Sequence, residues 1–122
     1  MPYIQEGRYI GLWAPQAFLD SSYIDIKAIC NGCGPQTSKF DFVPDSIYGL
    51  KIGTAWDIHD YMYQFGTNQK DRWEADITFL MNLIRIITNE TKNRLLRILR
   101  IYRATSYFLA VREKGEEAFN QK

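Results

Sequence analysis

Apolar residues recur at helical spacing in three stretches of the second half of the chain. In the first stretch Ala55, Ile58, His59 and Met62 fall at i, i+3, i+4 and i+7. This spacing predicts a helix with one inward face. The turn sequence QFGTN, at residues 64–68, ends it.

Two longer helices follow. The second is predicted to begin near Asp71, because Asp71 and Glu74 resemble a capping box, and its apolar pattern continues to Ile87. The third is predicted over about residues 93–114, with Gly115 as its C-cap. One face of this third helix carries Leu95, Leu99, Tyr102, Ser106 and Leu109.

The first half of the chain has less regular patterning. Residues 31–53 hold four of the eight glycines and two of the four prolines, which predicts a long irregular loop. Loops of this length in compact domains are usually functional or disordered, so we treat this one as part of a candidate site. QAFLDSSYIDI, after Pro15, favours a short helix, and no strand pattern is convincing. We therefore expect a mainly α fold.

Length and composition narrow the class of protein. A chain of 122 residues fits one domain, here residues 1–122, and a formal net charge of +1 points to no particular partner. The N-terminus lacks the basic leader and apolar run of a signal peptide, and no segment has the roughly 18 apolar residues of a membrane span. Two cysteines are too few for a disulfide framework. These features predict a cytoplasmic protein.

Two polar residues interrupt the apolar stripes of the first two helices. His59 lies on the inward face of one, and Asp76 lies on the inward face of the next. Helices joined by a short turn pack antiparallel, so the two side chains are expected to meet in a cleft between them. An unpartnered buried carboxylate would take up a proton, so Asp76 needs a donor. The alternative is a hydrogen bond that serves packing alone.

Asp60 adds a second carboxylate beside His59. It is turned about 100° around the helix from His59, so it is not needed to hold the imidazole and can bind a cation. The preceding loop would add carbonyl oxygens, which are ligands that calcium accepts. Of the acids near that loop, Asp41 and Asp57 fit solvated turn residues better. A histidine held by a carboxylate beside a cation is suited to activate water against an ester or phosphate.

The same residues resemble the phospholipase A2 superfamily, and most closely its small bacterial and fungal branch. The first catalytic helix of that family carries His-Asp-x-x-Tyr, here His59, Asp60 and Tyr63. The segment PDSIYGL, at residues 44–50, is similar to the one that precedes this helix, and RWEADITF supplies the arginine, aspartate and phenylalanine of the second helix as Arg72, Asp76 and Phe79. The resemblance covers about residues 28–119.

The resemblance implies a calcium-dependent hydrolase that cleaves the sn-2 acyl ester of glycerophospholipids. His59 would deprotonate water, Asp76 would orient His59, and Tyr63 would hydrogen-bond Asp76. Asp60 would hold Ca²⁺ together with loop carbonyls, for which the glycine-containing CNGCG sequence offers Gly32 and Gly34. Tyr63 packed as an ordinary aromatic remains an equal alternative.

Three features complicate this assignment. Trp56 stands where the family usually has a cysteine, so the fold would rest on packing alone. Cys30 and Cys33 have the spacing of half a zinc site or a redox pair, although the chain has no second Cys or His pair. A fold can also outlast its chemistry, so a catalytically silent lipid-binding or assembly module, of phage origin for example, stays open.

Basic residues concentrate near the C-terminus. Residues 85–114 hold eight of the 15 Lys and Arg residues against only Glu90 and Glu113. A peripheral contact with a phospholipid surface would use such charge, and a solvated helix face is the alternative. No nucleic-acid partner is expected, because no known binding motif is present.

Overall fold

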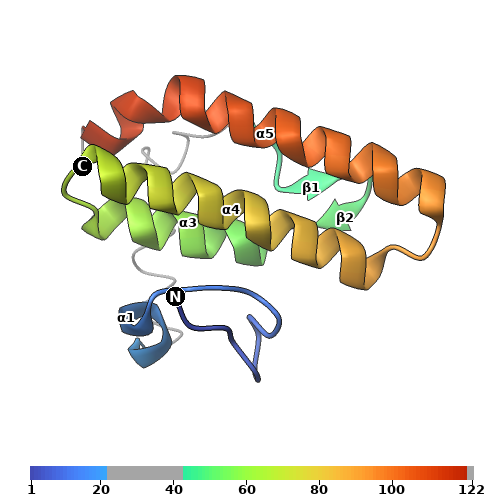
Figure 1. Ribbon diagram of the computed structural model, residues 1–122, viewed down its shortest axis with the longest axis horizontal. Coiled ribbons are helices and arrows are strands. Elements are labelled where there is room, and N and C mark those ends of the chain that lie inside the picture. The colour runs from blue at the N-terminus through green and yellow to red at the C-terminus, as the bar shows by residue number, and fades with distance from the viewer. Residues whose placement is uncertain (22–42, 121–122) are drawn as a thin grey trace.

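A computed structural model describes residues 1–21 and 43–120. These residues form a mainly helical fold, as the sequence predicts, with a very small sheet (Figure 1). The elements are α1 (Gln16–Asp20), β1 (Ser46–Ile47), β2 (Leu50–Lys51), α3 (Gly53–Phe65), α4 (Gln69–Glu90) and α5 (Arg94–Asn120). Gly32, Gly34, Cys30, Cys33 and Asp41 lie outside the described residues.

Each of the three long helices runs antiparallel to the one before it, and α4 packs against both α3 and α5 (Figure 1). The starts of α4 and α5 are capped by asparagines, whereas α3 begins after Ile52 without a side-chain cap. The Asn68 side chain accepts a hydrogen bond from the Asp71 amide at 2.9 Å, and Asn93 does the same for Leu96 at 2.9 Å. The predicted capping box of Asp71 and Glu74 is therefore wrong by three residues. Asp71 instead accepts from the Thr67 amide.

Two predictions for α5 are also wrong. Gly115 does not end the helix, which continues to Asn120. Gly115 is instead a buried residue at the point where the helix passes close to Tyr63 of α3. The face predicted from Leu95 to Leu109 points away from the fold. The buried face lies opposite and contains Ala104, Tyr107, Val111, Gly115, Ala118 and Phe119.

The expected irregular loop contains a two-stranded antiparallel hairpin, in which Ser46 pairs with Lys51 and Ile47 with Leu50. Tyr48 and Gly49 both have positive φ, at 46° and 84°, which is the backbone of a tight hairpin turn. Strands of two residues are too short for an alternating pattern, so the sequence carries no strand signal. Ile47 is fully buried, and the hairpin thereby closes one end of the core.

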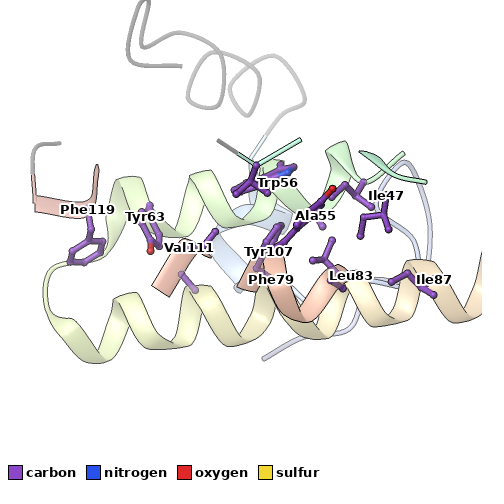
Figure 2. Packing of buried hydrophobic residues seen from close by; sticks show 14 residues of the cluster. Ile47, Ala55, Trp56, Tyr63, Phe79, Leu83, Ile87, Tyr107, Val111 and Phe119 are labelled. Atoms are coloured by element: carbon purple, nitrogen blue, oxygen red, sulfur yellow. The ribbon is translucent and has the colours of Figure 1, made fainter. Parts of the chain in front are cut away.

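The main core fills the space between α3, α4, α5 and the hairpin (Figure 2). Phe79, Leu83 and Ile87 on α4 are completely buried in it, and α5 contributes Val111, which is also completely buried. Trp56 packs on Phe79 with ring centroids 4.3 Å apart. The position where a cysteine was expected by resemblance thus contributes aromatic packing.

A second cluster fastens the N-terminal segment and α1 to the other side of α3. Asn82 on α4 bonds both the amide and the carbonyl of Trp13, at 2.7 and 3.0 Å. The Tyr9 hydroxyl donates to Asp57 at 2.9 Å. Asp57 is buried, so its interpretation as a solvated turn residue is wrong. No helix in the described part of the chain combines the length and apolar character needed to cross a bilayer.

Candidate functional site

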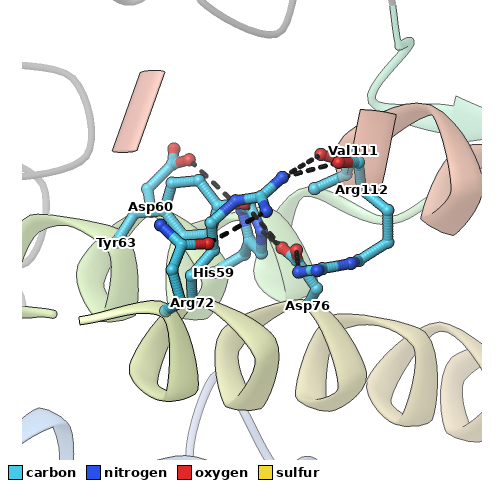
Figure 3. Close-up of polar contacts among 8 residues, drawn as sticks. His59, Asp60, Tyr63, Arg72, Asp76, Val111 and Arg112 are labelled. Atoms are coloured by element: carbon cyan, nitrogen blue, oxygen red, sulfur yellow. Dashed lines mark hydrogen bonds and ion pairs between the residues drawn. The ribbon is translucent and has the colours of Figure 1, made fainter. Parts of the chain in front are cut away.

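The candidate site lies between α3 and α4, with α5 as a third wall (Figure 3). His59 and Tyr63 are one turn apart on α3, so both side chains project from the same face toward α4. Asp76 comes from the second turn of α4 and meets them. His59 Nε2 and Asp76 Oδ1 are 2.8 Å apart, as the two apolar stripes predict.

Asp76 is completely buried and holds three hydrogen bonds. His59 and the Tyr63 hydroxyl, also at 2.8 Å, both reach Oδ1. Arg112 Nη1, from α5, donates to Oδ2 at 2.7 Å. Burial alone raises the pKa of Asp76, but the three donors outweigh it and hold the pKa below its usual value. The carboxylate is therefore ionised near neutral pH.

The ionised carboxylate determines the tautomer of His59. Asp76 can only accept hydrogen bonds, so Nε2 must carry a proton. The other ring nitrogen, Nδ1, lies 4.0 Å from Asp60 Oδ1. That distance is too long for a direct hydrogen bond but short enough for strong charge attraction. Burial lowers the pKa of His59, yet the Asp60 and Asp76 carboxylates raise it above its ordinary value.

Aromatic rings enclose the imidazole. Tyr63, Phe79 and Trp56 have centroids 4.2, 5.0 and 5.4 Å from that of His59. The exposed fraction of His59 is 0%, whereas the Asp60 side chain is 32% exposed. Water thus reaches the carboxylate beside Nδ1, and the ring itself is covered rather than open in a cleft.

Arg72 connects the site to α5. It is buried, and its Nη2 donates to the main-chain carbonyls of Val111 and Arg112, at 3.3 and 2.6 Å. These bonds hold the backbone from which the Arg112 side chain reaches Asp76. The Arg112 guanidinium also lies 4.8 Å from the ring centre of Trp73. Arg112 was not anticipated, because nothing in the sequence separates it from the other arginines of its basic stretch.

Gly115 has a role that its sequence position does not reveal. A Cβ atom there would lie 2.6 Å from the Tyr63 hydroxyl oxygen. Any larger residue would therefore displace the hydroxyl that bonds Asp76. Its contact with α3 spans more than fifty residues of chain, so no local pattern could have identified it.

The described residues fit a calcium ion only in part. Asp60 supplies a hard, partly exposed oxygen ligand beside the imidazole. Within residues 1–21 and 43–120, no three His, Cys, Asp or Glu side chains are grouped to hold a metal. Calcium coordination usually needs six to eight oxygens, so carbonyls from elsewhere would have to complete the set. Gly32 and Gly34, predicted for this purpose, lie outside the described residues.

Comparisons with known proteins add no assignment. No family model matches the chain, and neither the curated proteins nor the solved structures contain a match. Function must therefore be argued from the geometry of the site.

Proposed function

We propose that the chain is a calcium-dependent, phospholipase A2-like hydrolase that cleaves the sn-2 acyl ester of glycerophospholipids. The observation that carries the proposal is the position of His59 between two carboxylates. One ring nitrogen is fixed by the buried Asp76, and the other faces Asp60. A residue that only packs in a core needs one partner and no second carboxylate.

In the proposed reaction His59 acts as the general base. The Nε2 proton stays on the ring and is donated to Asp76, so Nδ1 holds the lone pair that removes a proton from water. The resulting hydroxide attacks the ester carbonyl, and the acyl C–O bond breaks. The proton on Nδ1 then passes to the leaving alkoxide, which gives a fatty acid and a lysophospholipid. Tyr63 and Arg112 keep Asp76 ionised throughout.

Asp60 is the proposed metal ligand, with carbonyls of Gly32 and Gly34 as further ligands. A bound Ca²⁺ would supply positive charge for the substrate phosphate and for the oxyanion of the attacked carbonyl. Without the ion, the negative charge of Asp60 beside the imidazole favours a protonated ring. The small number of cysteines favours a cytoplasmic enzyme.

Fatty-acid release from phospholipid vesicles tests the proposal directly. The wild type should release fatty acid with calcium and not with EDTA, and His59→Gln and Asp60→Asn should each abolish turnover. Asp20→Asn, which changes an exposed carboxylate on α1, is the matched control. A wild type that releases nothing, or an Asp60→Asn variant with normal turnover, would refute the hydrolase.

Full burial of His59 favours a second candidate, a catalytically silent lipid-binding or assembly module of the same fold. A sealed ring cannot meet an ester carbonyl unless the surrounding residues move. Calcium titration by calorimetry separates the two candidates, because a silent module has no need of the ion. Calcium binding by the wild type that is lost in Asp60→Asn would argue against silence.

A further inference from the structure

Helix α5 has two apolar faces, and only one of them is covered. Ala104, Tyr107 and Val111 lie on the face that packs against the core. The opposite face carries large apolar side chains at i, i+3, i+4, i+7 and i+14, a spacing that places them in one row. These residues, which we call the outer stripe, are Leu95, Ile98, Leu99, Tyr102 and Leu109, with exposed fractions of 46% to 76%.

The outer stripe differs from ordinary exposed hydrophobic residues. Single exposed apolar side chains, such as Ile10 and Phe65 here, are common and need no explanation. The outer stripe instead runs for about 21 Å along one side of one helix. A row of this kind, interrupted only by Ser106, marks a surface that contacts something apolar.

The charge around the outer stripe is strongly positive. From residue 91 to residue 112 the chain has no acidic residue, although its overall formal charge is only +1. The basic residues of this segment are Lys92, Arg94, Arg97, Arg100, Arg103 and Arg112. Arg94 and Arg103 lie on opposite edges of the stripe, because they are turned about 100° and 80° from Leu95 around the helix. Both are exposed.

Charge complementarity distinguishes among the possible occupants. A second copy of the chain, packed symmetrically on the same face, would set residues 91–112 of one protomer against the same residues of the other. Arg112 is paired with Asp76, but the other five positive charges on each side, with no acid between them, would repel. A nucleic acid would place its phosphates, which need cations, against the apolar row. An anionic lipid surface satisfies both features, since acyl chains take the apolar row and phosphates take the arginines.

We propose that the outer stripe of α5 docks on the surface of an anionic phospholipid bilayer. Leucine and isoleucine enter the boundary between headgroups and acyl chains, and Tyr102 keeps its hydroxyl among the headgroups. The basic residues on the edges of the stripe bind lipid phosphates. The biological role of this docking rests on the proposed function, because the outer stripe would be the surface through which a lipid hydrolase meets its substrate. Docking itself requires no catalysis.

The test is co-sedimentation with vesicles in EDTA, where calcium-dependent turnover is absent. The wild type should bind phosphatidylcholine vesicles containing 30% phosphatidylserine at least tenfold more tightly than pure phosphatidylcholine. Leu99→Ser with Tyr102→Ser should weaken binding at least tenfold. The matched control, Ile10→Ser with Phe65→Ser, removes equally exposed side chains from other elements and should bind as the wild type.

Charge variants and the oligomeric state complete the binding test. Lys92→Gln with Arg94→Gln should weaken binding about fivefold per residue, and added salt should weaken the wild type. Equal binding to both vesicle types, or unchanged binding by the Leu99/Tyr102 variant, would overturn the inference. So would a wild-type dimer that this variant converts to a monomer without any loss of vesicle binding, because the stripe would then join two copies.

A soluble substrate separates this inference from the proposed function. On a short-chain phospholipid below its micelle concentration, the Leu99/Tyr102 variant should hydrolyse at the wild-type rate, and on vesicles it should lose at least tenfold. Wild type that hydrolyses neither substrate would refute the hydrolase, and the sedimentation result would still decide the docking surface.

Discussion

Replacing Arg112 by glutamine removes one of the three donors to the buried Asp76 carboxylate. Breaking a fully buried ion pair costs about 3 to 5 kcal/mol, and a hydrogen bond to a charged group contributes about 1.5 to 3 kcal/mol. Arg112 is 29% exposed, and Asp76 keeps two donors, so the smaller figure applies. The lost contact with the Trp73 ring adds about 0.5 kcal/mol. The free energy of unfolding should therefore fall by about 2 to 3.5 kcal/mol.

Urea denaturation at neutral pH measures this change. Arg94→Gln, which removes an exposed arginine from the first turn of the same helix, is the control and should change stability by less than about 0.5 kcal/mol. A double-mutant cycle with Asp76→Asn isolates the pair. In the Asp76→Asn background, Arg112→Gln should cost less than about 1 kcal/mol, because no buried charge is left without its partner. A full-sized loss in that background, or a negligible loss in the wild type, would refute the proposed role of Arg112.

Three further predictions concern the same site. Gly115→Ala should destabilise the fold by about 1 to 3 kcal/mol in urea denaturation, because its Cβ would lie 2.6 Å from the Tyr63 hydroxyl. Gly53→Ala, where a Cβ meets nothing within 4 Å, is the control. Equal stability of the two variants would contradict the packing argument. Tyr63→Phe should cost about 1.5 to 3 kcal/mol by the same assay, since it deletes a donor to Asp76, whereas Tyr102→Phe on the exposed stripe should cost almost nothing. The stability that ionised Asp76 contributes is present above its ordinary pKa of 3.8 and is lost as the pH falls through its lower pKa in the folded state. The difference in unfolding free energy between wild type and Asp76→Asn should therefore narrow below about pH 4. A difference that stays constant with pH would contradict the lowered pKa.

Much of the site could be inferred from residue spacing. His59 and Asp76 each interrupt an apolar stripe, and a three-residue connection forces their helices to be antiparallel. The contact between them follows from helix geometry and from the need of a buried carboxylate for donors. Tyr63, one turn from His59, reaches the same oxygen, a contact that only the family resemblance implied. The contact between His59 and Asp76 joins two helices that are adjacent in the chain, so the spacing of residues along each helix is enough to predict it.

The contributions of α5 could not be inferred in this way. Arg112 lies 36 residues from Asp76 along the chain, and Gly115 lies 52 residues from Tyr63. Which of several arginines reaches the carboxylate depends on how α5 is rotated over α4. That rotation also decides which apolar face is buried, and periodicity alone selected the wrong one because α5 is apolar on both sides.

The sequence by itself determined the three long helices and the pairing of His59 with Asp76, because helical period and short connections leave few alternatives. Only the tertiary structure decided the burial of the imidazole, the arginine that completes the carboxylate's bonds, and the apolar row left uncovered on α5. Each of these depends on the packing of residues far apart in the chain. Such packing depends on the fit between complementary surfaces, and the pattern of residues along one helix does not specify that fit.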